Sequence, residues 1–582
     1  MNDLNNTIEL FLKLLPIQIF VNLASSLSRF VNGMIIGNNL SPAAMIASGV
    51  VSPLFSIIGS ISTIVSTGAG ILCGNYMGKG DTRKVDQVFS VSMILLGISG
   101  ILFTAVCFFF ANPLAVLLRA EESVIPETVA YIRGVALGIL PMLILPCLMT
   151  FLQMCNKSGV SLIATIVLAV LNAIFDLLVI RVWNGDIFGI GAATSLSQLF
   201  VTFGLIVYFL VRKKDLVSFR KEKPDKTMII DILKYGSPAS LAGILYSVRN
   251  IFLNSYASSV GGNDAVNALA ILGSFGGFLD AFNVGVGNTL TMLASVFIGE
   301  RDSGSLKRLM KITAVVGLSL CLFKFLIVYP FAGNISTLFG AHDSVISLSR
   351  QLLIFYAWCA PFNIFTLILM GIYQSLGRVR MCNMIYPINC VVVPLFCCIV
   401  LSKVFEIKAI WASYTIAEIV TLSVFCMTAM FKKKKLLIGV DDLLNLPKEF
   451  DTENKYSISI KQLSEVVEVS RSIEAFCKEK GIDSRRAMLA GLCMEEMAGN
   501  VVEHGFEKDR KENTIDIFAC VENDEVSLRL RDNCVPFDPN SRVEMFNPED
   551  PCKNIGIRMV SRIAKEINYH VNFGMNILTV KL

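Results

Sequence analysis

The stretch FKKKKLLIGVDDLLN, from Phe431 to Asn445, divides the chain into two parts of different composition. Long apolar runs dominate the residues before it, and the residues after it have the charge density of a soluble protein. Lysines at the end of an apolar run resist translocation and meet anionic lipid on the cytoplasmic side. The block Lys432 to Lys435 therefore predicts that the part after it is cytoplasmic. The lysines themselves either only stop the last helix or also make a regulatory contact with the lipid.

The composition excludes a water-soluble protein of this size. Hydrophobic residues make up 54% of the 582 residues, charged residues make up only 17%, and the mean hydropathy is +0.63. Apolar runs of about twenty residues recur, and each can cross the hydrocarbon core as a helix. The sequence therefore predicts a polytopic membrane protein in contact with the lipid bilayer. The net charge of +5 is assigned to cytoplasmic loops, so no nucleic-acid partner is expected. With three histidines and cysteines inside apolar runs, we expect neither a metal centre nor a disulfide framework.

Twelve apolar segments are predicted to cross the membrane as helices. Their spans are 10–37, 44–74, 87–110, 127–154, 160–182, 187–211, 228–258, 266–298, 308–330, 350–373, 381–402 and 407–431. Basic residues gather after the even-numbered segments, and the other loops are poor in them, with Lys403 and Lys408 as exceptions. Since cytoplasmic loops carry the excess of lysine and arginine, both termini are predicted to be cytoplasmic in a protein of the plasma membrane.

A long basic loop at 212–226 separates two sets of six segments that share a sequence pattern. Three pairs of residues have the same offset of 221 positions (299 − 78): Gly78 and Gly299, Asp81 and Asp302, and Gln153 and Gln374. The shared offset indicates a duplication. Each half has an even number of segments, so the two bundles are expected to have the same orientation, with a substrate cavity between them and alternating access by rocking.

We therefore expect an all-α polytopic membrane protein of two six-helix bundles, followed by a soluble α+β domain. The expected parts are an N-terminal bundle (1–211), a cytoplasmic linker (212–227), a C-terminal bundle (228–431), a basic and amphipathic linker (432–455) and the soluble domain (456–582).

The membrane part resembles a known transporter family. It combines six plus six helices, a G-x-G-D-type turn after segment two, and N-A-I-F-D in segment five. These features resemble the multidrug and toxic compound extrusion (MATE) transporters over about residues 8–431. The resemblance implies that Asn172 and Asp176 form a site in which the acid binds the coupling H⁺ or Na⁺. Segment one carries Asn32 where the family often has a second acid, so proton exchange is not expected there, although an amide oxygen suits Na⁺.

The residues themselves also single out Asp176. Asn172 and Asp176 are separated by one helical turn, so one helix face presents an amide and a carboxylate together. A carboxylate at this depth is costly and is expected to face a cavity or a partner. The alternatives are that Asp176 pairs with a buried donor, or that it lies near the outer interface with Arg181. The other intramembrane charges are expected to form structural pairs or to lie at helix ends; they are Arg29, Arg249, Asp280, Lys324 and Glu418, with Arg249 and Asp280 as the first expected pair.

The soluble part reads as an α+β sandwich. YSISIK (456–461), TIDIFACV and EVSLRLR alternate apolar and polar residues as half-buried strands do, with a hairpin turn at Asn523 and Asp524. Apolar residues from Val466 to Phe476 recur at helical spacing, and a second helix begins near Asp483 or Ser484. A helix containing IRMVSRIAKEI and a final strand NILTVKL complete the expected domain.

The motifs of this domain resemble the GHKL ATP-binding fold, in particular the anti-sigma-factor serine-kinase branch. The residues that carry the resemblance are Glu496 and Asn500 of the E-x-x-x-N box, Asp532 in RLRDNCVPFDP, Gly556 in NIGIRMVSRI, and Thr579 on the last strand. The resemblance implies ATP and Mg²⁺ as cofactors, with Asn500 at Mg²⁺, Glu496 as the catalytic base, and Asp532, Gly556 and Thr579 around the nucleotide. Cys534 and Asn554 replace glycines of the family pattern, so a nucleotide-free docking module is the alternative.

Three functions follow from these features. The first is a secondary antiporter that exports small organic cations or drugs by H⁺ or Na⁺ exchange, with a cytoplasmic ATP-binding regulatory domain. The second is a membrane sensor whose soluble domain acts as an ATP-dependent serine kinase on a cytoplasmic regulator protein. The third is a lipid-intermediate flippase of the related twelve-helix architecture. The chain has no G-x-x-x-x-G-K-[ST] motif, so it does not resemble an ATP-driven pump of that class. Asp176 beside Asn172 favours the antiporter, and the linker at 431–455 is expected to couple nucleotide state to transport.

Overall fold

The computed structural model describes most of the chain. The described residues are 5–183, 185–212, 217–219, 225–337, 342–435, 440–444, 446–447, 450, 455–506, 513–522, 524–536, 538 and 555–582. Asn523 of the predicted hairpin turn and Asn554 of the later glycine box lie outside them.

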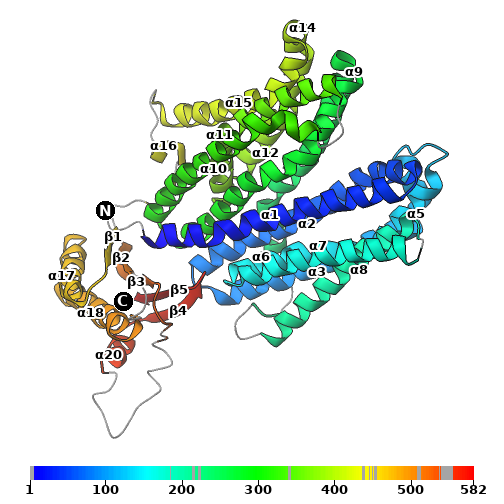
Figure 1. The fold of residues 1–582 in the computed structure, drawn as a ribbon. Helices are drawn as coiled ribbons and strands as arrows, with labels where there is room; N and C mark the ends of the chain where they lie inside the picture. The colour runs from blue at the N-terminus through cyan, green and yellow to red at the C-terminus, as the bar shows by residue number, and fades with distance from the viewer. Residues whose placement is uncertain are drawn as a thin grey trace.

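The N-terminal bundle is built from long apolar helices that run together in Figure 1. They are α1 (Asn5–Asn39), α2 (Pro42–Gly78), α3 (Thr82–Phe109), the bent pair α5 (Ile125–Ala136) and α6 (Ile139–Met154), α7 (Ser158–Arg181) and α8 (Ile187–Val211), with the short α4 (Ala111–Leu117) between α3 and α5. The α5–α6 pair bends by 47° and forms one broken span. Many of the bundle's exposed side chains are large and apolar, as expected for a surface in contact with lipid.

The C-terminal bundle repeats this architecture. It contains α9 (Lys226–Gly299), α10 (Ser303–Thr337), α11 (Asp343–Ser375), a run from α12 (Val379–Pro387) through η2 (Ile388–Val392), α13 (Val393–Phe396) and η3 (Cys397–Leu401) to α14 (Ser402–Phe405), and α15 (Ile407–Lys433). A straight helix as long as α9 would measure about 110 Å, more than three times the thickness of the hydrocarbon core. Gly262, with a φ of 63°, divides α9 into two spans.

The number of spans agrees with the sequence. Among the described residues, ten helices are long and apolar enough to cross a membrane, and the bent pair makes eleven. The second half of α9 makes twelve. The predicted fold class, two bundles of six helices followed by an α+β domain, is confirmed.

The two bundles meet at one end and diverge at the other, and the soluble domain lies at the end where they meet (Figure 1). Glycines allow the close approach of α2 and α9 there. A Cβ atom on Gly78 would lie 2.2 Å from the Val296 carbonyl oxygen, and one on Gly299 would lie 2.2 Å from the Asn75 carbonyl oxygen. The repeated glycine pair therefore seals the contact between the two halves. We call this the closed end of the molecule and the opposite end the open end.

The soluble domain contains one antiparallel sheet with strand order β1-β2-β3-β5-β4. Its strands are β1 (Lys455–Ile460), β2 (Ile515–Glu522), β3 (Glu525–Asp532), β4 (Glu566–Asn572) and β5 (Met575–Lys581). The helices α17 (Leu463–Glu479), α18 (Ser484–Gly505) and α20 (Ile555–Ile563) pack on one face of the sheet and form its apolar core. The other face turns toward the bundles (Figure 1).

One element of this domain was predicted wrongly. The predicted helix through IRMVSRIAKEI ends at Ile563, and Glu566 and Ile567 begin strand β4 instead. The sequence EINYHVN places Ile567, Tyr569 and Val571 at alternate positions, which is the period of a strand. A tight turn at Phe573 and Gly574, both with positive φ, then returns the chain into β5.

Candidate functional site

Among the described residues of the N-terminal bundle, one acid is buried, Asp176. Its side chain on α7 is fully buried, and neither carboxylate oxygen has a hydrogen-bond partner among the described residues. Asn172 lies one turn earlier on the same buried stretch, and its Nδ2 atom donates to the Thr194 hydroxyl on α8 at 3.2 Å. Arg181, the alternative partner from the sequence, is exposed and forms no ion pair with Asp176.

Helix α1 brings Asn32 to the same region. Val31, Ile35 and Ile36 of α1 form an apolar cluster with Phe175 and Val179 of α7. This cluster places the turn around Asn32 beside the turn around the acid. The Oδ1 atom of Asn32 is buried and also has no hydrogen-bond partner among the described residues.

These side chains can hold a small cation. A buried carboxylate without a partner is expensive when it is ionised, so it is stable only when it holds a proton or a cation. Carboxylate and amide oxygens are ligands that hard cations accept in proteins. Asp176 and the amide oxygen of Asn32 therefore suit either a proton on the acid or a Na⁺ ion held by oxygen atoms.

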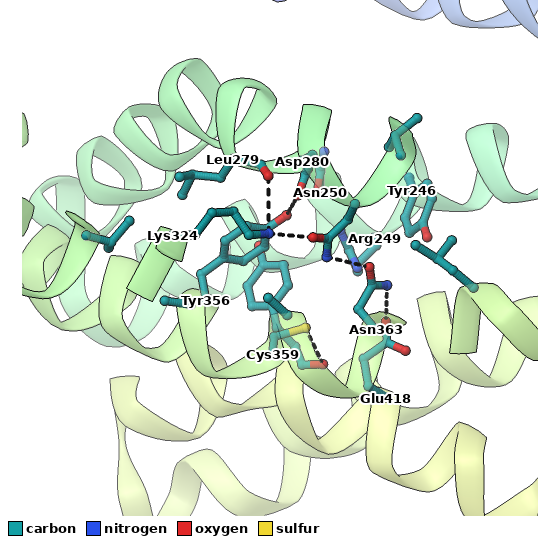
Figure 2. Close-up of a pocket in the computed structure, with 17 residues that line it drawn as sticks. Tyr246, Arg249, Asn250, Leu279, Asp280, Lys324, Tyr356, Cys359, Asn363 and Glu418 are labelled. Carbon is teal, nitrogen blue, oxygen red and sulfur yellow. Dashed lines mark hydrogen bonds between the residues drawn. The ribbon is translucent and has the colours of Figure 1, made fainter. Parts of the chain in front are cut away.

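The C-terminal bundle holds a different arrangement, a cavity of about 320 Å³ shown in Figure 2. Four charged side chains from α9, α10 and α15 line it: Arg249, Asp280, Lys324 and Glu418. The hydrogen bonds of Asp280, Lys324 and Glu418 join them to neutral groups. The Tyr356 hydroxyl donates to Asp280, the Lys324 Nζ atom donates to Asn283 Oδ1 and to the Leu279 carbonyl, and the Asn363 Nδ2 atom donates to Glu418.

The predicted ion pair between Arg249 and Asp280 is wrong. Asp280 accepts its hydrogen bond from Tyr356, and the Arg249 guanidinium lies between the rings of Tyr246 and Tyr414, 4.8 Å from each ring centroid. Two basic and two acidic side chains thus line one cavity, and the described residues show no direct ion pair among the four. Sequence reasoning treated these residues one by one; their common position in the second half was the signal that they form one group.

A second cavity of about 340 Å³ lies between the bundles. Both halves line it, with mainly neutral polar and apolar side chains that include Gln18, Asn288, Thr291 and the repeated pair Gln153 and Gln374. The Gln18 Nε2 atom donates to Gln153 at 2.9 Å, and the Gln374 Nε2 atom donates to the Tyr235 carbonyl at 2.7 Å. The repeated glutamines thus mark equivalent walls of the central cavity.

The soluble domain brings most of the predicted nucleotide residues to one face of its sheet. Glu496 and Asn500 lie on α18, and a Cβ atom on Gly556 at the start of α20 would meet the Glu496 carboxylate. Asp532 ends β3 on the helix-covered face, where its Oδ1 atom accepts hydrogen bonds from Asn576 Nδ2 and from the Cys534 amide. Burial raises the pKa of Asp532.

The structure does not bring Thr579 to the other nucleotide residues. Thr579 is the register partner of Arg529, whose side chain extends from the face of the sheet that is turned away from the helices. The residue of β5 that contacts Asp532 is Asn576, which sequence reasoning missed. Cys534, in place of a family glycine, is buried, and its Cβ atom packs against Gly505 at the end of α18. The remaining set of Glu496, Asn500, Asp532 and Gly556 offers carboxylate and amide groups and a glycine at the start of α20, where backbone N–H groups would suit a phosphate.

The chain matches two known families. It matches the MatE family twice, over residues 18–178 and 238–399. It matches the histidine kinase-like ATPase domain over residues 461–582. Both predicted resemblances are confirmed, and the two MatE matches confirm the predicted repeat.

Relatives and solved structures agree with these matches. The multidrug export protein MepA of Staphylococcus saprophyticus is 23% identical over 402 residues, which cover 67% of this chain and 86% of MepA. MepA of Staphylococcus aureus strain bovine RF122 is 22% identical over 397 residues, with the same coverage. An outward-facing multidrug resistance MATE family transporter superposes with a TM-score of 0.69 at 18% identity, over 74% of this chain and 98% of its own. A mutant of the Vibrio cholerae MATE transporter VcmN gives 0.70 at 17% identity, over 77% and 100%. At these identities the structural likeness shows the fold.

Proposed function

Because this chain belongs to the MatE family, we propose that it is a secondary antiporter that exports small organic cations across the plasma membrane in exchange for H⁺ or Na⁺. The observation that carries the proposal is the fully buried carboxylate of Asp176, which has no hydrogen-bond partner among the described residues. Such a group needs a proton or a cation to remain stable in the bundle. The relatives named as multidrug export proteins support drugs as the substrates, and the negative charge of the buried acid favours cationic ones.

Exchange follows from competition for one negative charge. When Asp176 holds a proton or Na⁺, the N-terminal bundle carries no uncompensated charge and does not attract a cationic substrate. When the ion leaves, the charge of Asp176 attracts the substrate toward the N-terminal bundle from the central cavity. Asn172 and Asn32 supply amide oxygens near the acid. Their role is to stabilise the ion-bound state, and Na⁺ gains more from them than a proton does.

The histidine kinase-like domain is assigned a regulatory role. Bound ATP supplies a charged ligand and, with Mg²⁺, a phosphoryl group for transfer. We assign Mg²⁺ binding to Asn500, acceptance of a proton from an attacking hydroxyl to Glu496, and binding of the adenine amino group to Asp532. The basic loops and the lysine block support a cytoplasmic position for this domain and for both termini. The closed end then faces the cytoplasm and the open end faces outward.

Transport into proteoliposomes tests the antiporter assignment. The purified full chain is reconstituted, and uptake of a fluorescent organic cation is followed under an imposed pH gradient or an imposed Na⁺ gradient. We expect gradient-driven uptake in the wild type and a fall to the protein-free background in Asp176→Asn. The matched control is Asp186→Asn, because Asp186 caps α8 outside the buried site and asparagine caps a helix equally well. Unchanged uptake in Asp176→Asn contradicts the assignment.

A further inference from the structure

The sheet of the soluble domain carries a polar face that is buried against the bundles. Arg531 on β3 is only 2% exposed, which is unusual for arginine on a strand that its own helices do not cover. Its guanidinium contacts Asp516 of β2 at 3.0 Å and, across the domain boundary, Glu300 at 3.2 Å and Asp302 at 3.5 Å. A further hydrogen bond joins Arg531 to the Ser305 hydroxyl at 2.9 Å. This cluster fixes the sheet to the turn between α9 and α10.

The same face of the sheet also contacts the N-terminal bundle. On β4, Asn568 Nδ2 donates to the Gly80 carbonyl at 3.0 Å, and Asn572 Nδ2 donates to the Met77 carbonyl at 3.2 Å. Beside β2, the Thr514 hydroxyl donates to Asn6 Oδ1 on α1 at 2.6 Å. One rigid sheet therefore contacts both bundles at the closed end (Figure 1).

The two contacted turns are equivalent positions of the repeat. Gly78 and Asp81 flank the turn after α2, and Gly299 and Asp302 flank the turn after α9, at the shared offset. These turns follow directly on a close approach of α2 and α9, at Gly78 and Gly299. Alternating access in a two-bundle transporter requires this end to open, so the turns must move apart. A sheet that holds both turns cannot follow both of them.

From this geometry we propose that the soluble domain is a clamp: it ties the closed ends of the two bundles together and holds the transporter open to the outside. Inward opening requires that the sheet leave one of the two turns. The proposal rests on the alternating access of the proposed function but on neither its substrate nor its coupling ion. It assigns the sheet face that carries Arg531 as the docking surface, with the two repeated turns of this same chain as its partners.

The contact of the sheet with the C-terminal bundle is harder to break than its contact with the N-terminal bundle. The contact with the C-terminal bundle contains buried ion pairs, and separating them would leave charges without partners. The contact with the N-terminal bundle consists of hydrogen bonds: Asn568 and Asn572 donate to backbone carbonyls, Asn533 donates to the Glu9 carboxylate, and Lys13 donates to the Phe573 carbonyl. Water replaces such hydrogen bonds at a smaller cost than that of separating buried ion pairs.

The linker also attaches the soluble domain to the C-terminal bundle. The Tyr373 hydroxyl donates to the Leu443 carbonyl, and the Arg378 guanidinium donates to the Leu444 carbonyl, both at 2.7 Å. Helix α16 (Val440–Leu444) is thus attached to α11 and the turn after it, in the C-terminal bundle. The domain therefore stays with that bundle and releases the N-terminal one.

The predicted nucleotide residues and the docking surface lie on opposite faces of the sheet. Successive residues of a strand point to opposite faces. Arg531 therefore docks on the bundles, while its neighbour Asp532 faces the helices with the predicted nucleotide residues. A nucleotide that shifts the end of β3 thus acts directly on the docking cluster, without occupying the docking surface itself.

Disulfide trapping in the full chain tests the clamp. The double variant Asn6→Cys/Thr514→Cys joins the sheet to the N-terminal bundle, and Arg301→Cys/Glu522→Cys joins it to the C-terminal bundle, where the native side chains form a 3.0 Å ion pair. After mild oxidation we expect the first pair to reduce transport at least tenfold and a reductant to restore it. We expect the second pair to leave transport unchanged. The oxidised native chain controls for the native cysteines.

A conformational readout keeps the test independent of transport. Spin labels at Glu122 and Lys403 report the separation of the two bundles at the open end. The oxidised Asn6/Thr514 pair should keep only the long distance, and the reduced form should populate a shorter one as well. The clamp is overturned if the oxidised pair still populates the short distance. It is also overturned if the Arg301/Glu522 crosslink blocks opening as strongly as the Asn6/Thr514 crosslink.

Discussion

The two bundles share one architecture but hold their buried charges in opposite ways. Among the described residues of the N-terminal bundle, Asp176 is the one fully buried acid, and it has no hydrogen-bond partner there. The C-terminal bundle has two cations and two anions around one cavity (Figure 2). At the repeat offset, Asp176 corresponds to Cys397 and Asp280 corresponds to Gly59, so neither acid has a charged counterpart. The two halves therefore share their helix architecture but differ in their buried charged residues. The first half holds the acid that we propose to be exchangeable, and the second half holds equal numbers of acidic and basic side chains.

The largest expected effect on stability comes from unbalancing the C-terminal cavity. Lys324→Met removes a buried cation and leaves two buried anions against one cation. Removing one partner of a buried charge set typically costs about 3–5 kcal/mol. We expect a clearly lower unfolding temperature in detergent. Lys311→Met on the exposed side of the same helix is the control and should change little. Equal stability of both variants would contradict the balanced-charge interpretation.

The glycine at the closed end is repeated in both bundles, so replacing it should destabilise the protein equally in either bundle. Gly299→Ala places a methyl group about where the Asn75 carbonyl lies, and Gly78→Ala does the same at the Val296 carbonyl. Each is expected to lower the free energy of unfolding by up to about 3 kcal/mol, because the helices must move apart.

Gly97→Ala on α3 is the control for the glycine pair, since a Cβ atom added there would have no other atom within 4 Å. Alanine favours a helix at this position, so the variant should be neutral or slightly stabilised in thermal unfolding. A loss of stability in only one of the variants Gly78→Ala and Gly299→Ala would show that the closed end is not symmetric.

The docking contacts give a pH-dependent test of the difference between the bundles. His570 on β4 lies against the turn at Gly80, and burial together with nearby Arg529 lowers its pKa to about 4. A lowered pKa means that the docked state binds fewer protons. The contact with the N-terminal bundle should therefore have its full strength above about pH 6.5 and weaken as the pH falls toward 4.

Between pH 7 and 5 the expected loss of this contact is about 2 kcal/mol, and spin labels at Lys84 and Lys565 should report a growing separation. His570→Gln should remove most of this dependence. If the variant kept the same pH profile as the native chain, another group would have to control the contact.

The smallest expected change in stability is that of Asp176→Asn. The variant removes a buried charge that has no partner to lose among the described residues, so the free energy of unfolding should change by less than about 1 kcal/mol or increase. Thermal unfolding of Asp176→Asn and Lys324→Met, measured in parallel, tests this difference in stability. A large loss of stability in Asp176→Asn would show that the acid has a structural partner.

The sequence predicted the features that depend on local periodicity. The twelve spans follow from their apolar length, and the repeat follows from residues such as Gly78 and Gln153, which the structure places at the bundle contact and in the central cavity. Strand β4 was missed because the pattern of the helix before it runs on into Glu566 and Ile567.

Contacts between distant parts of the chain were not accessible to sequence reasoning. Nothing near Arg531 in the sequence indicates that Glu300 and Asp302 surround it, because these residues meet only after the domain docks. The expected pair of Arg249 and Asp280 was wrong for a related reason: Tyr356, which donates to Asp280, and Tyr414, which stacks on Arg249, come from other helices. The linker at 431–455 was expected to couple the parts, and the structure adds a second connection through the sheet.

The most direct test of the central claim is to measure which residue releases an ion when substrate binds. The purified full chain is titrated with an organic cation in weakly buffered solution, and the H⁺ or Na⁺ released is counted for the native chain, Asp176→Asn and Glu418→Gln. The exchangeable charge of the N-terminal bundle predicts release from the native chain and from Glu418→Gln, and none from Asp176→Asn. Undiminished release from Asp176→Asn, or its loss in Glu418→Gln alone, would contradict the account.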